Sequence, residues 1–291
     1  MDEITLKALA KINLGLDVVR RREDGYHEVR MIMQTIHLYD LLEIQKIREP
    51  GIQIVSNLSF LPVNENNLVY KAARLLQEEF ALTDGISIKL TKRIPVAAGM
   101  AGGSTDAAAM LYAMNQLYDL GLSRRELMKR GVQIGADVPY CLMRGTALAE
   151  GIGEKLTQLP PMIKCPVLIA KPSISVSTRF VYQNLKLDEQ TNHPDIDALM
   201  KDIREKDFDG VCAHMGNVLE SVTIPNYPVI AEIKQQMMRS GAKASMMSGS
   251  GPTVFGLFED GETAKRALRE MKRSGLAKQV YLTTIYNNRR K

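Results

Sequence analysis

The sequence predicts an α+β protein with two domains, and three patterns carry that prediction. Every even position from residue 4 to residue 18 is apolar, which is the period of a strand with one buried face. A glycine-rich loop at residues 95–105 leads into an alanine-rich helical stretch. Residues 228–285 follow the order helix, strand, strand, helix, strand, which is typical of helices packed on a sheet. Because the pattern of apolar and polar residues changes beyond Pro161, we expect one domain at residues 1–160 and a second at 161–291.

The first domain begins with the alternating strand. A strand over residues 4–18 is longer than most, so we expect a bulge or break near residues 8–10. Apolar residues at helical spacing then predict a helix over residues 68–80, and a short strand follows at 86–90. This strand leads directly into the glycine-rich loop.

Two polar residues mark the starts of the helices that follow the loop. Ser104 is the expected N-cap of the first helix, because a serine hydroxyl accepts a hydrogen bond from a free backbone N–H group. Ser123 and Glu126 have the spacing of a capping box, which predicts a second helix running toward Gly135.

The second domain is expected to open with a strand at residues 166–170. A polar stretch near residues 188–195 follows it, and helices are expected from residue 196 onward. The final run consists of a helix at 228–240, strands at 243–247 and 253–258, a helix at 262–273 and a strand at 279–285.

Composition excludes several classes of protein. The 38 Lys and Arg against 33 Asp and Glu give a net charge of +5, but the positive residues are scattered and aromatic residues make up only 5%. We therefore expect a solvated surface and no nucleic-acid partner. No apolar run approaches the length of a membrane span and no leader precedes the first strand, so we expect no membrane association and a cytoplasmic location. The three cysteines and four histidines lack metal-ligand spacing, so no structural metal is expected.

The glycine-rich loop is the strongest functional signal. A turn of this kind between a strand and a helix exposes backbone N–H groups, and the helix N-terminus adds partial positive charge, so phosphate is the expected ligand. Gly99, Gly102 and Gly103 permit close approach, while Ser104 and Thr105 add hydroxyl donors. A tight turn without a ligand is the alternative. The loop lacks the Gly-Lys-Ser/Thr end of a Walker loop, and the chain lacks a dinucleotide fingerprint.

Two further segments add chemistry. Lys11 and Asn13 lie on the polar face of the first strand, which places an ammonium and an amide side by side. Asp137 lies between Gly135 and Pro139, where a helix is expected to end. A solvated lysine and a turn aspartate are the alternatives.

Taken together, these segments resemble the GHMP superfamily of small-molecule kinases, named after galactokinase, homoserine kinase, mevalonate kinase and phosphomevalonate kinase. The three motifs that carry the resemblance are AKINLGL at 10–16, PVAAGMAGGSTDAA at 95–108 and MSGSGPTV at 247–254. The pieces REDGYH at 22–27, NLV at 67–69, GADVP at 135–139 and GTALAEGIGE at 145–154 resemble one branch of the family more narrowly. Met100 and Ala101 depart from the family, in which Leu-Gly is commoner, and Thr105 replaces a serine.

The resemblance implies an α+β, two-domain GHMP kinase fold, with an N-terminal nucleotide-binding domain of the ribosomal-S5 type and a ferredoxin-like C-terminal domain. It also implies transfer of the γ-phosphoryl group of ATP, with Mg²⁺, to a small-molecule acceptor. In the branch that matches, the acceptor is a cytidyl diphosphate sugar alcohol of the non-mevalonate route to isoprenoid precursors, and its 2-hydroxyl is phosphorylated.

The resemblance also assigns roles to residues. Asp137 is similar to the aspartate that takes the proton from the acceptor hydroxyl, and Lys11 to the lysine that orients the reacting pair. Asn13, Tyr26, His27 and Tyr182 are the expected acceptor-binding residues, with the tyrosines stacking on the cytosine and His27 bonding to its edge. The residues expected to bind ATP are Asn67, Leu68, Pro95, Val96, Ala97, Ala98, Gly99, Met100, Ala101, Gly102, Gly103, Ser104 and Thr105. Ser104 is the candidate for the magnesium, which the sequence otherwise leaves without an assigned ligand, and the oligomeric state stays open.

Two other functions remain open at this point. Another GHMP kinase with a different alcohol acceptor would share the ATP loop and differ at Tyr26 and His27. A nucleotide-binding protein without activity would share the fold, although the presence of both Lys11 and Asp137 argues against it.

Overall fold

The computed structural model describes residues 2–189 and 191–288, and their contacts group them into two compact units that interleave along the chain. Unit 1 contains residues 2–10, Leu38–Val96 and Ala101–Met143. Unit 2 contains Lys11–His37, Ala97–Met100 and the described residues from 144 onward. The predicted domains, residues 1–160 and 161–291, are each one continuous stretch of chain, unlike these interleaved units. The boundary after residue 160 stays a prediction.

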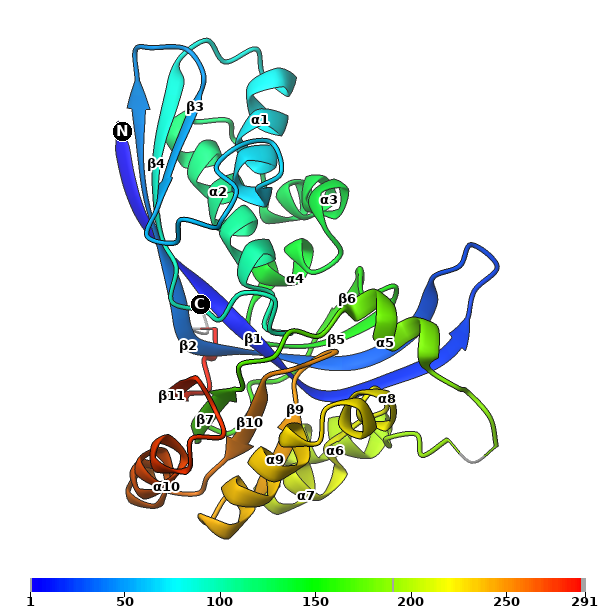
Figure 1. Cartoon of the computed structure of the whole chain (residues 1–291). Helices are drawn as coiled ribbons and strands as arrows, with labels where there is room; N and C mark the ends of the chain where they lie inside the picture. Colours follow the sequence, from blue (N-terminus) through cyan, green and yellow to red (C-terminus); the bar gives the residue numbers. More distant parts are fainter. Residues whose placement is uncertain (1, 190, 289–291) are drawn as a thin grey trace. The chain divides into compact units, whose positions relative to one another are not determined.

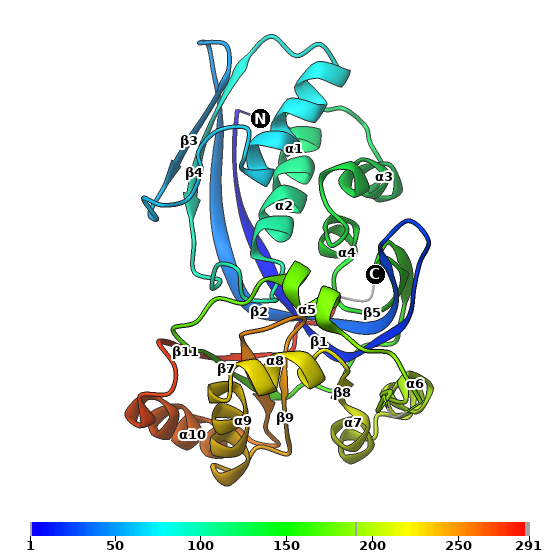
Figure 2. The same ribbon diagram turned by 45° about the vertical axis from the view of Figure 1, so that its right-hand side comes forward.

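Unit 1 is a small sheet with helices. Its sheet is formed by β3 (Ile52–Ser56), β4 (Gly85–Thr91), the second half of β2 (His27–Ile47) and the start of β1 (Glu3–Arg21). β3 pairs with β4 in parallel, and β4 pairs with β2 antiparallel. The helices, all seen in Figure 2, are α1 (Leu68–Glu79), α2 (Gly102–Leu117), α3 (Arg124–Ile134) and α4 (Val138–Met143). α2 packs against the other three, and most of its side chains are buried.

The capping box is the best example of a local signal that the structure follows. The Ser123 side chain accepts the Glu126 N–H, and the Glu126 carboxylate accepts the Ser123 N–H, so both halves of the box form. α3 ends at Gly135 as the sequence predicts. The helix over residues 68–80 and the strand over 86–90 are confirmed as α1 and β4.

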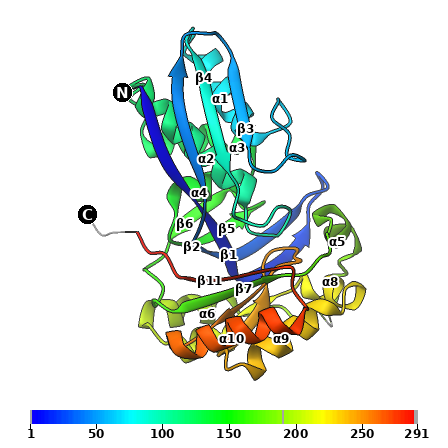
Figure 3. The same ribbon diagram turned by 60° about the vertical axis from the view of Figure 1, so that its left-hand side comes forward.

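Unit 2 contains the predicted α+β run. An antiparallel sheet has the order β11-β7-β10-β9, formed by β7 (Pro166–Lys171), β9 (Ala244–Met247), β10 (Val254–Leu257) and β11 (Gln279–Thr284). The helices α9 (Val229–Arg239) and α10 (Gly261–Ser274) pack on this sheet, as Figures 1 and 3 show. The order α9, β9, β10, α10, β11 confirms the prediction for residues 228–285.

The remaining elements of unit 2 attach to the long strands. β5 (Thr146–Gly151) pairs with β2 and with β6 (Lys155–Gln158), while the two-residue β8 (Gly216–Asn217) pairs with β1 in parallel. The other helices are α5 (Thr178–Asn184), α6 (Ile196–Glu205), α7 (Phe208–His214) and α8 (Glu220–Asn226).

Two predictions about the first strand meet a different structure. β1 continues without interruption from Glu3 to Arg21, so it has no break near residues 8–10, and a bulge there stays a prediction. Its middle, from residue 8 to residue 16, is buried on both faces rather than on one. The physical reason is that neighbours cover the face that carries Lys11 and Asn13, so the polar alternation does not mark a solvated face.

Candidate active site

The glycine-rich loop begins with a series of left-handed backbone conformations. Ala97, Gly99 and Ala101 have φ angles of 50°, 69° and 55°. Alternating left-handed residues turn successive N–H groups toward one side, which is the geometry that binds anions. Ala101 adopts this conformation although an alanine reaches it only at a cost. Position 101, where glycine is commoner in the family, thus has a backbone conformation that favours glycine.

The helix after the loop starts earlier than predicted. Its N-cap is Ala101, which has no polar side chain to cap the helix, and Ser104 is the third helical residue. The prediction of Ser104 as N-cap is wrong because the left-handed turn at Ala101 starts the helix three residues earlier. The N–H groups of Gly102 and Gly103 consequently lie at a helix terminus that no side chain caps.

In unit 2, the first part of the loop contacts the third family motif. The Ser248 hydroxyl donates to the Gly99 carbonyl oxygen at 3.0 Å. A Cβ on Gly99 would collide with the Ser248 carbonyl oxygen, so only glycine fits here. Gly249 lies against Gly99 and beside the Asn13 side chain. Segments separated by about 150 residues in sequence therefore meet at this loop.

Lys11 and Asn13 join the same group of contacts. The Lys11 ammonium donates to the Asn13 side-chain oxygen at 2.7 Å, which confirms that the two side chains share a face of β1. The Lys11 N–H donates to the Met100 carbonyl oxygen at 3.2 Å. Lys11 is only 5% exposed and Asn13 is fully buried. The alternative of a solvated lysine is therefore wrong.

An aromatic pocket lies in the same unit. The cavity has a volume of about 580 Å³, and its lining includes three of the four predicted acceptor-binding residues, Tyr26, His27 and Tyr182, but not Asn13. The His27 and Tyr182 rings lie 5.1 Å apart, tilted by 44°, while Tyr26 is 61% exposed at the rim. Burial lowers the pKa of His27, and the charge of Arg21 lowers it further. A neutral imidazole has both a donor and an acceptor nitrogen, which suits the edge of a base.

The aromatic pocket is joined to the glycine loop through hydrogen bonds. Thr178, which lines the pocket, shares a hydrogen bond of 2.8 Å with the hydroxyl of Ser250. Ser250 belongs to the turn whose Ser248 contacts Gly99. The pocket, this turn, the loop and Lys11 thus form one connected set within unit 2.

Unit 1 contains the other predicted residues. Leu68 lies close to Gly103, and Ser104 lies close to Gly135, two residues before Asp137. Asp137 is half-buried in the turn between α3 and α4, where its carbonyl oxygen accepts the Cys141 N–H at 3.0 Å. Leu68, the start of α2 and the Asp137 turn are therefore neighbours.

Two predicted ATP-binding residues of this unit use their side chains internally. Asn67 caps α1 through a 2.9 Å bond from the Val69 N–H to its oxygen, and its amide nitrogen donates to Pro62. The Thr105 hydroxyl, which was expected to be a donor to phosphate, instead donates to the Leu9 carbonyl oxygen at 2.8 Å.

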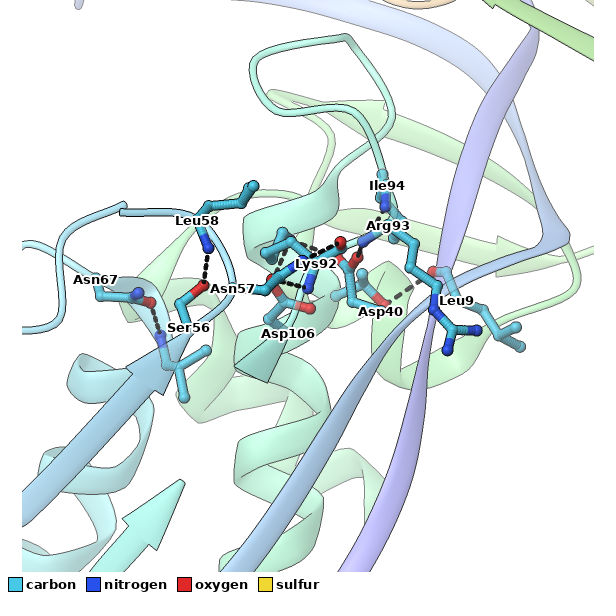
Figure 4. Close-up of polar contacts among 12 residues, drawn as sticks. Leu9, Asp40, Ser56, Asn57, Leu58, Asn67, Lys92, Arg93, Ile94 and Asp106 are labelled. Atoms are coloured by element: carbon cyan, nitrogen blue, oxygen red, sulfur yellow. Dashed lines mark hydrogen bonds and ion pairs between the residues drawn. The ribbon is translucent and has the colours of Figure 1, made fainter. Parts of the chain in front are cut away.

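Sequence reasoning missed a buried charge cluster in unit 1, shown in Figure 4. The Lys92 ammonium donates to the carboxylates of Asp40 and Asp106, and the three side chains are at most 3% exposed. Asp40 also accepts the N–H groups of Arg93 and Ile94. The cluster ties the residues after β4 to the first turn of α2. It therefore fixes the chain just before and just after the glycine-rich loop, in both cases within unit 1. Asp106 precedes Ala109, Met110 and Ala113 on the buried face of α2, and this position was the available sequence signal.

The described residues contain neither a metal-binding cluster nor a helix that could span a membrane. Across residues 2–189 and 191–288, no three His, Cys, Asp or Glu side chains gather in a way that would hold a metal ion. Within the same residues, every helix is too short or too polar to cross a bilayer.

The chain matches two models of one kinase family. The model of the GHMP kinases N terminal domain matches residues 67–145, and that of the GHMP kinases C terminal matches residues 199–277. The chain is 58% identical over 286 residues to the 4-diphosphocytidyl-2-C-methyl-D-erythritol kinase of Lachnospira eligens, covering 98% of this chain and 99% of the relative. It is 55% identical over 289 residues to the kinase of the same name from Lachnoclostridium phytofermentans, covering 99% of each.

Solved structures agree. A crystal structure of 4-(cytidine 5'-diphospho)-2C-methyl-D-erythritol kinase matches with a TM-score of 0.85 and 32% identity, covering 98% of this chain and all of the other. The homoserine kinase from Cytophaga hutchinsonii shares the fold, with a TM-score of 0.80 at 22% identity over 98% of this chain and 95% of its own. The two-domain α+β kinase fold expected from the motifs is confirmed. This chain belongs to the GHMP kinase family.

Proposed function

We propose that this chain transfers the γ-phosphoryl group of ATP to the 2-hydroxyl of 4-diphosphocytidyl-2-C-methyl-D-erythritol, in the non-mevalonate route of isoprenoid precursor biosynthesis. The observation that carries the proposal is the connected set in unit 2. There, Lys11, Asn13 and the glycine loop join an aromatic pocket of the size and character that a pyrimidine nucleotide needs. The names of relatives 55–58% identical over nearly the whole chain support the same acceptor.

The glycine loop fits the phosphates of ATP. Its left-handed turns and the helix terminus without a side-chain cap supply N–H donors and partial positive charge. Leu68 beside Gly103 supplies an apolar surface for the adenine in this proposal. Mg²⁺ would arrive with ATP and neutralise charge on the phosphates, and the Ser104 hydroxyl in the first turn of α2 is our candidate protein ligand.

The aromatic pocket fits the cytosine. Tyr26 and Tyr182 offer ring faces for stacking, and His27 offers hydrogen bonds to the base edge. A hydrogen-bond network fixes the Tyr26 backbone, because its N–H donates to Asp24 at 3.1 Å and its carbonyl accepts the Arg22 N–H at 2.8 Å. This pocket favours a cytidyl acceptor over homoserine or mevalonate, which have no base.

The chemistry requires a proton acceptor and a cation. Phosphoryl transfer is mostly positioning and charge stabilisation, with a carboxylate to take the proton as the new bond forms. We assign the proton transfer to Asp137 and the stabilisation of the developing alkoxide to Lys11. Asn13 accepts from the Lys11 ammonium and so holds it in place.

The first experiment tests Asp137 and the acceptor together. ADP release is measured with the cytidyl acceptor, homoserine and mevalonate, for the wild type and for Asp137→Asn. We expect ADP only with the cytidyl acceptor and a fall in kcat of about 10²–10⁴-fold in the variant, which is the usual contribution of a positioned base. The matched control is Asp84→Asn, an exposed aspartate of the same unit, which should keep wild-type turnover.

The outcomes separate the candidates. ADP with homoserine or mevalonate instead would favour another kinase of the family. ATP binding without ADP from any acceptor would favour a protein without activity. Wild-type turnover in Asp137→Asn would remove the proposed base.

We also propose that the enzyme acts in the cytoplasm on a small molecule alone, without a nucleic-acid partner. ATP and a metabolite acceptor support that location. Fractionation of producing cells should recover the ADP-releasing activity with the cytoplasmic fraction. Recovery with the membrane or periplasmic fraction would contradict this location.

A further inference from the structure

We propose that Arg21 and Arg179 hold the diphosphate of the acceptor at the edge of the aromatic pocket. The inference rests on the function proposed above and extends it to the part of the acceptor between the base and the reacting hydroxyl. Arg21 belongs to β1 and Arg179 to the first turn of α5, and both line the cavity that contains Tyr26, His27 and Tyr182.

The charge of this pocket is the first argument. Its lining contains two arginines and no carboxylate, and its remaining members are uncharged or histidine: Gly25, Tyr26, His27, Val29, Ile152, Thr178, Tyr182, Gln183 and Leu185. A planar guanidinium group binds phosphate oxygens through two parallel hydrogen bonds, which an ammonium group does not. The pocket therefore suits a ligand that is aromatic at one end and anionic at the other.

A second cavity of unit 2 provides a contrast. It is larger, about 910 Å³, and its lining contains three carboxylates, those of Asp188, Asp195 and Glu220, against one ammonium group, that of Lys186. Those negative charges oppose an anionic ligand, so the surplus of positive charge belongs to the aromatic pocket and is not a general property of unit 2.

A comparison with neighbouring arginines shows that the guanidinium groups of Arg21 and Arg179 are not engaged in ion pairs with described residues. Arg20 pairs with Glu28, Arg22 with Asp24 and Arg30 with Asp197. Among the residues that the structure describes, neither Arg21 nor Arg179 forms an ion pair, and both are exposed. Arg21 lies close enough to His27 for its charge to act on that ring. Two guanidinium groups thus remain open to a phosphate beside the proposed base site.

Connectivity within unit 2 gives the position of the diphosphate. Thr178, next to Arg179 in sequence, shares a hydrogen bond with Ser250, and the turn that contains Ser250 contacts Gly99 of the glycine loop. An acceptor with its base among the tyrosines and its hydroxyl at the loop must carry its diphosphate between those two places. Arg179 lies beside the contact that joins them.

The test is to measure binding of cytidine, CMP and CDP by calorimetry, for the wild type, for the double variant Arg21→Gln/Arg179→Gln and for Arg20→Gln. In the wild type CDP should bind at least about tenfold more tightly than cytidine, because charge-assisted hydrogen bonds are added. In the double variant this preference should vanish while the affinity for cytidine stays the same. Arg20→Gln, on the same strand but outside the pocket lining, should keep the full preference.

The result also distinguishes the inference from the function on which it rests. If cytidine does not bind to the wild type, the proposed acceptor is wrong and this inference falls with it. If cytidine binds but CDP is not preferred, or if the preference survives in the double variant, the acceptor stands and the role of the two arginines is overturned. A KM for the acceptor raised about tenfold in the double variant would be the kinetic counterpart of the expected binding result.

Discussion

The two buried lysines among residues 2–189 and 191–288 have different surroundings. Lys92, in unit 1, lies between the carboxylates of Asp40 and Asp106, and the N–H groups of the next two residues, Arg93 and Ile94, donate to Asp40. Lys11, in unit 2, donates to the neutral amide of Asn13 and lies against the glycine loop. Burial alone therefore does not separate a structural lysine from the lysine that we propose to be functional. Two carboxylates neutralise an ammonium group, whereas the amide oxygen of Asn13 orients an ammonium group without cancelling its charge.

The largest effect on stability is expected at Lys92. Lys92→Met leaves two carboxylates buried without their cation, and such an uncompensated pair destabilises a protein by about 3–5 kcal/mol. The free energy of unfolding, measured by urea titration, should fall by this amount. The pKa of Lys92 is raised, because attraction to the two carboxylates outweighs the effect of burial. The ammonium group is therefore charged at neutral pH.

A compensated variant serves as the control for Lys92. Replacing all three members, as Lys92→Met/Asp40→Asn/Asp106→Asn, removes the buried charges together and should recover part of the lost stability. A wild-type urea midpoint in Lys92→Met alone would contradict the structural role assigned to this lysine.

Lys11 should show the opposite behaviour. Lys11→Met removes the hydrogen bond to the Asn13 amide, and the loss of this bond should lower the free energy of unfolding by about 1 kcal/mol. It should lower kcat by about 10²–10³-fold, as the loss of one charged group that stabilises the transition state does. Steady-state ADP release and urea titration on the same preparation measure both quantities.

Lys7→Met is the matched control for Lys11. Lys7 lies on the same strand, with its ammonium 4.6 Å from the centre of the Tyr39 ring, and its replacement should leave kcat unchanged. If Lys11→Met unfolds as readily as Lys92→Met, the distinction between the two lysines is wrong.

The two clusters also show what the sequence can predict. Lys11 and Asn13 are two residues apart on a strand, so their shared face follows from the period of two. The capping box of Ser123 and Glu126 is local in the same way. Lys92, in contrast, is 52 residues from Asp40 and 14 from Asp106, and only the tertiary fold brings them together.

The predictions that failed also depended on contacts or backbone turns that the local sequence pattern does not determine. The break expected in β1 came from the usual length of strands, but β1 continues because different parts of it find different neighbours, such as β8 beside Gly15 and Leu16. Ser104 was expected as N-cap from its residue type, whereas the backbone turn at Ala101 decides where α2 begins. The positions of Arg21 and Arg179 in one pocket depend on contacts between segments about 160 residues apart in sequence.

The smallest expected effect concerns the pH dependence of the Lys92 cluster. Burial raises the pKa of Asp106 well above its ordinary value of 3.8, although Lys92 acts in the opposite direction. One oxygen of this carboxyl, Oδ1, has no hydrogen-bond partner among the described residues. A raised pKa means that the folded state binds the proton more tightly than the unfolded chain does. The contribution of Asp106 to stability is therefore largest in acid and is lost as pH rises from the unfolded pKa to the folded one.

Asp106→Asn tests this sign. The asparagine keeps an oxygen for the Lys92 ammonium but does not titrate, so the variant should lack the loss of stability that the wild type shows as pH rises. Urea midpoints from about pH 3.5 to about pH 8 cover the range above the ordinary pKa of an aspartate, in which the loss of stability is expected. The variant should gain on the wild type toward neutral pH, by about 1 kcal/mol, with Asp84→Asn as the control that shows no such trend. A difference in midpoint that stays constant across this range would mean that Asp106 is ionised throughout, and that Lys92 offsets the cost of its burial.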